Sequence, residues 1–209
     1  MKLFKKRKKK PTVSIKKDKE KKETKPKDFL KIIVAGEGGV GKTTFLHRYV
    51  EEKFIPDTKL TVGVQFFLKE IIIDGMGYKL QLWDLGGEIQ FRSILQYYLN
   101  GAYGALLMFD LTRMTTLNRI EEWVKMIRDE DPNLPILLLG TKLDLGEKIS
   151  VDDIYPLELR ERYNLDDYLK VSSKTGIKIN EPFDILTRRI FKQERFLKTK
   201  VEGLSLTGN

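Results

Sequence analysis

The stretch FLKIIVAGEGGVGKTTF, residues 29–45, runs from apolar residues through a glycine-rich turn into a helical pattern. Its first part, residues 29–36, is almost entirely apolar and predicts a buried strand, and a helix is predicted from about Lys42 to Glu52. The turn between them, GEGGVGKT (36–43), matches the pattern G-x-x-x-x-G-K-[ST] between a strand and a helix. A glycine-rich turn rarely has this pattern and this context by chance, so the stretch predicts a phosphate-binding loop.

Phosphate is the ligand that the chemistry of this loop favours. Glycines let the backbone curl so that successive N–H groups point at phosphate oxygens, and the helix N-terminus adds a partial positive charge. We expect the Lys42 ammonium to contact the β- and γ-phosphates and the Thr43 hydroxyl to coordinate Mg²⁺. The predicted phosphate-binding residues are Gly36, Glu37, Gly38, Gly39, Val40, Gly41, Lys42, Thr43 and Thr44.

Beyond the loop, the sequence alternates between strand patterns and helix patterns. The further predicted elements are two antiparallel strands within 64–84 with a turn at 74–77, strands at 105–111 and 135–144, a helix at about 116–130, a strand at 168–173, and a C-terminal helix after Asn180. The near-continuous apolar runs are typical of parallel strands that are covered on both faces. The predicted fold class is therefore α/β, a doubly wound, mostly parallel six-stranded sheet with one antiparallel strand and helices on both faces.

The basic charge of the chain is concentrated at its N-terminus. The net charge is +9, but residues 1–28 contain 14 Lys/Arg and 4 Asp/Glu, so the rest of the chain is close to neutral. This lysine-rich segment cannot bury enough apolar surface to form a core, and we expect a disordered tail. The predicted organisation is a tail at 1–28, one domain at 29–197, and a flexible C-terminus at 198–209.

The composition bounds the compartment and the partners. No apolar run is long enough to span a membrane, and the absence of cysteine excludes disulfides, cysteine-ligated metals and cysteine lipidation. We expect a cytoplasmic monomer. Three roles are open for the tail. It is a solvated segment without a partner, it contacts the anionic inner surface of a membrane, or, as the weaker alternative, it contacts nucleic acid.

The phosphate loop and the segments that follow it resemble the Ras/Rab-like small GTPases of the P-loop GTPase superfamily. The matching segments are FIPDTKLTVGVQF (54–66) for the first switch, WDLGGE (83–88) for the second switch, QFRSILQYYLNGAYGALLMFDLT (90–112) after it, TKLD (141–144) for base recognition and VSSK (171–174) for the last loop. The resemblance covers residues 29–197. It implies a Ras-like fold and a switch that binds GTP or GDP with Mg²⁺, hydrolyses GTP slowly, and is served by effector, activator and exchange proteins that the sequence does not name. The missing cysteine and the basic tail would suit a prokaryotic or archaeal member.

The resemblance also assigns the metal site and the catalytic residues. Thr43, Thr61 and, through water, Asp84 would hold Mg²⁺. A hydroxyl on a flexible segment binds the ion only while a γ-phosphate orders that segment, so loss of this phosphate would release Thr61. Gly87 completes D-x-x-G with Asp84, and its N–H group is expected at the γ-phosphate. The expected catalytic residues are Lys42, Thr61 and Glu88.

Glu88 departs from the family pattern, in which glutamine orients the attacking water. An ionised glutamate only accepts hydrogen bonds and brings negative charge towards the phosphate, although it could also polarise water as a base. The sign of its effect is therefore open. The alternative function is a GTP-bound scaffold with little hydrolysis. A second departure is Gly86, where Rab proteins usually have alanine.

Guanine selectivity follows from Asp144, whose carboxylate can accept from two adjacent N–H donors that guanine has and adenine lacks. This disfavours an ATP-using enzyme. The resemblance places Lys142 and Phe54 on the two faces of the base. The remaining predicted nucleotide-binding residues are Thr141, where asparagine is commoner, Ser172 in support of Asp144, and Ser173 and Lys174, whose N–H groups would meet the guanine oxygen.

Overall fold

The computed structural model describes residues 28–56, 59–88 and 96–206. For residues 28, 96 and 194–206 the description is limited to the backbone. The predicted disorder of residues 1–28 concerns a segment that, apart from Asp28, lies outside the described residues.

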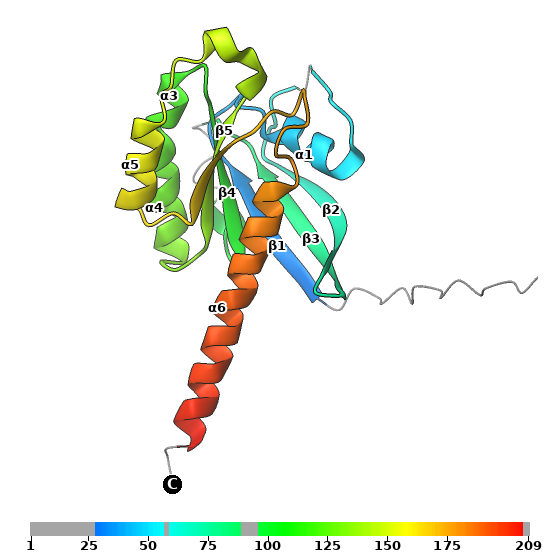
Figure 1. The fold of residues 1–209 in the computed structure, drawn as a ribbon, viewed down its shortest axis with the longest axis vertical. Helices are drawn as coiled ribbons and strands as arrows, with labels where there is room; N and C mark the ends of the chain where they lie inside the picture. Colours follow the sequence, from blue (N-terminus) through cyan, green and yellow to red (C-terminus); the bar gives the residue numbers. More distant parts are fainter. Residues whose placement is uncertain (1–27, 57–58, 89–95, 207–209) are drawn as a thin grey trace, which may run out of the picture.

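A six-stranded sheet forms the centre of the domain (Figure 1), with the strand order β2-β3-β1-β4-β5-β6. β2 and β3 pair antiparallel, and the other neighbouring strands pair parallel. The strands are β1 (Asp28–Ala35), β2 (Val64–Ile73), β3 (Met76–Leu85), β4 (Gly104–Asp110), β5 (Ile136–Thr141) and β6 (Asp167–Lys170). This mixed sheet confirms the predicted fold class.

Helices cover both faces of the sheet, as Figure 1 shows for α1 and α6 on one side and α4 and α5 on the other. The α-helices are α1 (Lys42–Glu51), α3 (Met114–Leu117), α4 (Ile120–Glu130), α5 (Ile154–Arg162) and α6 (Glu181–Leu206), and two 3₁₀ helices are η2 (Gln96–Tyr98) and η3 (Leu143–Lys148). Among the described residues, no helix is both long and apolar enough to cross a membrane.

Alternating side chains of β1 supply two separate cores. Ile32 and Val34 pack with α1 and α6 around Phe45 and Phe183. Ile33 belongs to the other core, which contains Trp123 of α4. Because a strand buried on both faces needs apolar residues at every position, the continuous run in β1 follows directly from its central place in the sheet.

Three elements differ from the sequence prediction. The helix predicted at 116–130 is divided into α3 and α4, which are separated by Asn118 and Arg119. The Thr116 hydroxyl donates to the Arg113 carbonyl oxygen at 2.7 Å and accepts from the Asp110 N–H group, which ties α3 to the end of β4. Helix α5 was not predicted. In the C-terminal stretch expected to be flexible, α6 continues to Leu206, so the boundary at residue 197 is not a helix end.

Candidate nucleotide-binding site

The turn between β1 and α1 has a backbone path that its glycines make possible. Gly36 has φ 134° and Gly41 has φ 98°, values that L side chains rarely adopt. At Gly36, a Cβ atom would also lie 2.0 Å from the Met108 carbonyl oxygen of β4. The loop therefore passes against β4 at a distance that no side chain permits.

Lys42, the first residue of α1, is a buried cation inside this loop. Its Nζ donates to the Gly36 carbonyl oxygen at 2.7 Å and to the Glu37 carbonyl oxygen at 3.0 Å, and the residue is 5% exposed. Burial lowers the pKa of Lys42 to about 8, although the charges of Asp84 and Glu37 oppose this shift. A cation that is costly to bury here is a favourable partner for an anion that enters the loop.

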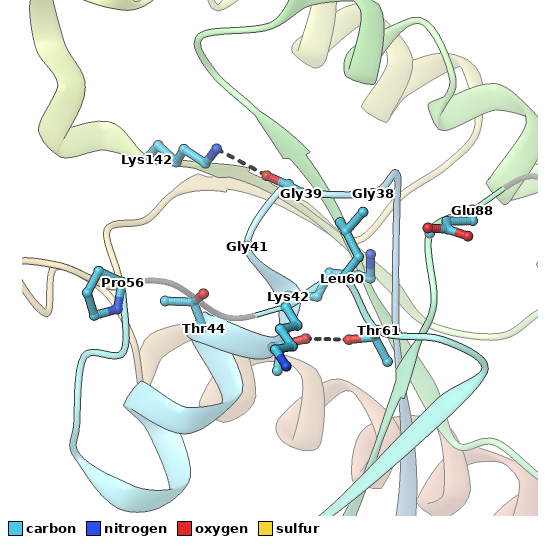
Figure 2. Close-up of a pocket in the computed structure, with 13 residues that line it drawn as sticks. Gly38, Gly39, Gly41, Lys42, Thr44, Pro56, Leu60, Thr61, Glu88 and Lys142 are labelled. Atoms are coloured by element: carbon cyan, nitrogen blue, oxygen red, sulfur yellow. Dashed lines mark hydrogen bonds between the residues drawn. The ribbon is translucent and has the colours of Figure 1, made fainter.

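Three oxygen-bearing side chains from different segments meet beside Lys42. Thr43 Oγ1 lies 2.5 Å from Asp84 Oδ2 and 2.8 Å from Thr61 Oγ1 (Figure 2), and Thr61 Oγ1 lies 3.3 Å from Asp84 Oδ2. Thr43 is the second residue of α1, Asp84 belongs to β3, and Thr61 precedes β2. Two hydroxyls and a carboxylate are the hard oxygen donors that Mg²⁺ prefers.

Asp84 also carries an unsatisfied oxygen. The residue is 0% exposed, and its Oδ1 is buried without a hydrogen-bond partner among the described residues. Burial raises the pKa of this carboxyl, partly offset by the Thr43 hydrogen bond and the Lys42 charge. A buried carboxylate oxygen without a partner is unfavourable unless a cation or its water approaches, so the donor set fits a magnesium ion.

Gly86 and Gly87 bring the end of β3 against the loop and the first switch. A Cβ atom on Gly87 would lie 2.2 Å from the Gly38 nitrogen, and one on Gly86 would lie 2.6 Å from the Thr61 carbonyl oxygen. Gly86 also donates its N–H to the Gly63 carbonyl oxygen at 2.7 Å. The departure to glycine at position 86 thus allows the two switch segments to touch.

A cleft of about 170 Å³ opens between these parts at the carboxyl ends of the parallel strands. Its lining includes Gly39, Gly41, Thr44, Glu88 and Lys142. Figure 2 shows Glu88 near Gly38, on the side away from Pro56. Glu88, which replaces the glutamine of the family pattern, therefore lies beside the phosphate loop.

On the base side, the structure brings together part of the predicted set. Ser172 Oγ donates to Asp144 Oδ1 at 2.6 Å, and Lys142 Nζ donates to the Gly39 carbonyl oxygen at 3.1 Å. Ser173 and Lys174 lie in the turn after β6. Phe54 is 37% exposed, and the lining of the cleft includes neither Phe54 nor Asp144, so the placement of Phe54 on the base stays a prediction.

Thr141 lies buried against the phosphate loop. It is 3% exposed, and its hydroxyl lies 2.7 Å from the Val40 carbonyl oxygen and 2.9 Å from that of Phe109. A threonine hydroxyl can therefore hold the phosphate loop from outside. The sequence therefore keeps a hydrogen bond to the Val40 carbonyl oxygen although threonine stands where asparagine is commoner.

Sequence reasoning missed the buried carboxylate of Asp110 and its partner Arg113. Asp110 Oδ2 lies 2.7 Å from Lys142 Nζ and 2.9 Å from Arg113 Nε, and Arg113 Nη2 donates to the Gly38 carbonyl oxygen at 3.1 Å. The available signal was position: Asp110 ends a parallel strand, at the edge where such sheets bind their ligands.

Comparison with known proteins places these features in one family. The model of the Ras family matches residues 31–192. Ras-related protein RIC2 of Oryza sativa subsp. japonica and Ras-related protein Rab11E of Lotus japonicus are each 34% identical over 167 residues, which is 79% of this chain and 76% of the relative. Ras-related protein YPTC6 of Chlamydomonas reinhardtii is 34% identical over 166 residues, 78% of this chain and 76% of the relative. These relatives are plant and algal, so they give no support to a prokaryotic or archaeal origin. The matched region contains the loop, both switches and the base motif, and the chain belongs to the Ras family of small GTPases.

Proposed function

We propose that this chain is a guanine-nucleotide switch that binds GTP or GDP with Mg²⁺ and hydrolyses GTP slowly. The observation that carries the proposal is the meeting of Thr43, Thr61 and Asp84 beside the buried Lys42 cation. Three segments far apart in the sequence converge on the place where the phosphate loop would hold a γ-phosphate. No single motif requires this convergence, but a magnesium nucleotide does.

In this proposal Thr43 and Thr61 hold Mg²⁺ directly and Asp84 holds it through water. When bound, the ion would supply positive charge that offsets the negative charge of the phosphates. Thr61 lies in the segment between α1 and β2, and Gly87 lies against the Gly38 nitrogen of the loop. Loss of the γ-phosphate would remove the contacts that keep these two segments together, which makes them the moving parts of the switch.

Effector proteins would bind where these segments present apolar side chains. Leu60 and Val62, on either side of Thr61, are 57% and 72% exposed, and Phe66 of β2 is 45% exposed. Phe66 packs edge-on against Trp83, with ring centroids 5.5 Å apart. Exposed apolar residues grouped next to a segment that moves are typical of an interaction surface.

Glu88 sets the expected rate. Its carboxylate accepts hydrogen bonds but cannot donate one to a transferring phosphoryl group, as a glutamine amide can. We expect single-turnover hydrolysis at roughly 10⁻⁴ to 10⁻² s⁻¹, the range of family members without an activator. The alternative is a GTP-bound scaffold, which the position of Glu88 at the cleft favours because its charge lies close to the phosphate loop.

The test is hydrolysis of GTP by the purified protein with Mg²⁺, compared with Glu88→Gln and with Glu158→Gln. Glu158 is an exposed glutamate of α5 and serves as the matched control. A rate that changes in Glu88→Gln alone supports a switch in which Glu88 acts on the attacking water. A wild-type rate above about 1 s⁻¹ contradicts slow turnover, and GTP that stays intact in all three proteins supports the scaffold.

The N-terminal tail would bring the domain to an anionic membrane surface. Seven of its first ten residues are Lys or Arg, each worth about 1 kcal/mol near such a surface, and Leu3 and Phe4 can insert. We expect the full chain to sediment with anionic vesicles but not neutral ones, and the effect to disappear without residues 1–28. Binding that is insensitive to salt contradicts this proposal, and salt-sensitive binding to RNA alone favours the nucleic-acid alternative.

A further inference from the structure

The phosphate loop is held from outside by side chains that the nucleotide does not need to touch. Three consecutive carbonyl oxygens each accept from a different residue. Arg113 Nη2 donates to Gly38 at 3.1 Å, Lys142 Nζ donates to Gly39 at 3.1 Å, and Thr141 Oγ1 lies 2.7 Å from the Val40 oxygen. The three donors come from the ends of β4 and β5.

These contacts determine where the loop N–H groups point. In a trans peptide, the carbonyl of one residue and the N–H of the next lie in one plane and point in opposite directions. A donor that fixes the Gly38 carbonyl therefore fixes the Gly39 N–H, and donors at Gly39 and Val40 fix the N–H groups of Val40 and Gly41. Gly39 and Gly41 line the cleft, so N–H groups held in this way would be available to a phosphate bound there.

Asp110 connects two of these three donors. Its side chain is 1% exposed, and its Oδ2 pairs with Arg113 Nε at 2.9 Å and with Lys142 Nζ at 2.7 Å. Burial alone would raise the pKa of Asp110, but hydrogen bonds from Lys142, Thr112 and Arg113 outweigh it and hold the pKa below its usual value. The carboxylate is therefore charged at neutral pH and compensated by both cations.

The position of Arg113 is itself fixed by the turn that follows β4. Its N–H donates to the Asp110 carbonyl oxygen at 2.9 Å, and its carbonyl oxygen accepts from Thr116 Oγ1 at 2.7 Å. The guanidinium forms a fork, with Nε on Asp110 and Nη2 on Gly38. A lysine offers a single nitrogen and could not occupy both positions with the same geometry.

We propose that Arg113, held by Asp110, is a positioning residue for phosphate binding: it orients the Gly39 N–H and thereby slows nucleotide release. This inference deepens the proposed function and rests on it. Arg113 acts through the loop backbone and does not touch the phosphates. It is distinct from Lys142 and Asp144, which the base motif already assigns.

The test measures release of mant-labelled GDP from Arg113→Ala, Arg113→Lys and Arg160→Ala in Mg²⁺. Arg160 of α5 pairs with Glu161 and serves as the control for loss of a surface arginine. We expect release about tenfold faster in Arg113→Ala, the low end for loss of a charged donor because Lys142 and Thr141 remain, and an intermediate rate in Arg113→Lys. We also expect the phosphorus NMR signal of the GDP β-phosphate to move in Arg113→Ala and to stay in place in Arg160→Ala.

Other results have separate meanings. Wild-type release in Arg113→Ala overturns the inference. The inference is also overturned if Arg113→Ala releases GDP faster while its β-phosphate signal stays in place, and Arg113→Lys releases GDP as fast as Arg113→Ala. That pattern reflects general loosening of the fold. Wild-type protein that retains no GDP contradicts the proposed function, and this result is distinguishable because it needs no variant.

Discussion

Lys42 should make the stability of the nucleotide-free protein depend on pH. Its ammonium is almost fully buried, and burial lowers its pKa from 10.5 to about 8. Between these two pKa values the unfolded chain holds a proton on Lys42 that the folded chain has largely lost. The free energy of unfolding therefore rises with pH in this window.

The expected size follows from the same two values. Between pH 7.5 and 9.5, proton linkage at a lysine with pKa about 8 when folded and 10.5 when unfolded raises the free energy of unfolding by about 2 kcal/mol. For a domain of this size, such a gain moves the urea midpoint by about 1 M. Most of the window lies below the pH at which tyrosines ionise, so the change at Lys42 can be separated from theirs.

The assay is urea unfolding of nucleotide-free protein in EDTA at the two pH values, for the wild type and for Lys42→Met. Subtraction of the two proteins cancels the other titrating groups and should leave the gain of about 2 kcal/mol in the wild type. Saturating GDP should remove the difference, since phosphate charge keeps Lys42 protonated. Equal pH dependence of the two proteins would refute the description of Lys42 as a buried cation that awaits an anion.

Three further variants follow from the site geometry. Gly36→Ala should lower the free energy of unfolding by roughly 3 kcal/mol or more, because its Cβ would lie 2.0 Å from the Met108 oxygen; a normal melting temperature would contradict the loop path. Asp84→Asn should raise the melting temperature in EDTA, since burial raises the pKa of Asp84 and so disfavours its charged form, and should abolish stabilisation by Mg²⁺ with GTP. Stabilisation by Mg²⁺ that persists would exclude Asp84 from the metal site. Gly87→Ala should weaken GTP binding about tenfold more than GDP binding, because the methyl group would meet the Gly38 nitrogen, and titrations of both nucleotides test this.

Much of the fold was predictable because its signals are local. The continuous apolar run of β1 and the glycine-rich turn after it each depend on neighbouring residues, and both predict the structure well. Helix α5 was missed although two local signals existed: Pro156 in its first turn, and the Asp152 carboxylate accepting from the Ile154 N–H at 3.0 Å. Its weak apolar periodicity concealed both.

Local patterns predicted the phosphate loop, and the family resemblance grouped Thr43, Thr61 and Asp84, which meet in the structure, but contacts between distant residues outside the family motifs were not predictable. The contact between Arg113 and Gly38 joins residues 75 apart, and that between Thr141 and Val40 joins residues 101 apart. Such contacts depend on the order of strands in the sheet, which no single segment contains.

The most direct test is to measure the equilibrium affinities of the purified protein for GDP and for ADP in the presence of Mg²⁺, by displacement calorimetry. We expect GDP to bind at least about 10⁴-fold more tightly than ADP, because Asp144 would lose both hydrogen-bond donors with adenine. Asp144→Asn should remove most of this preference. Comparable affinity for the two nucleotides, or binding of neither, would contradict the central claim that this cleft is a guanine-nucleotide site.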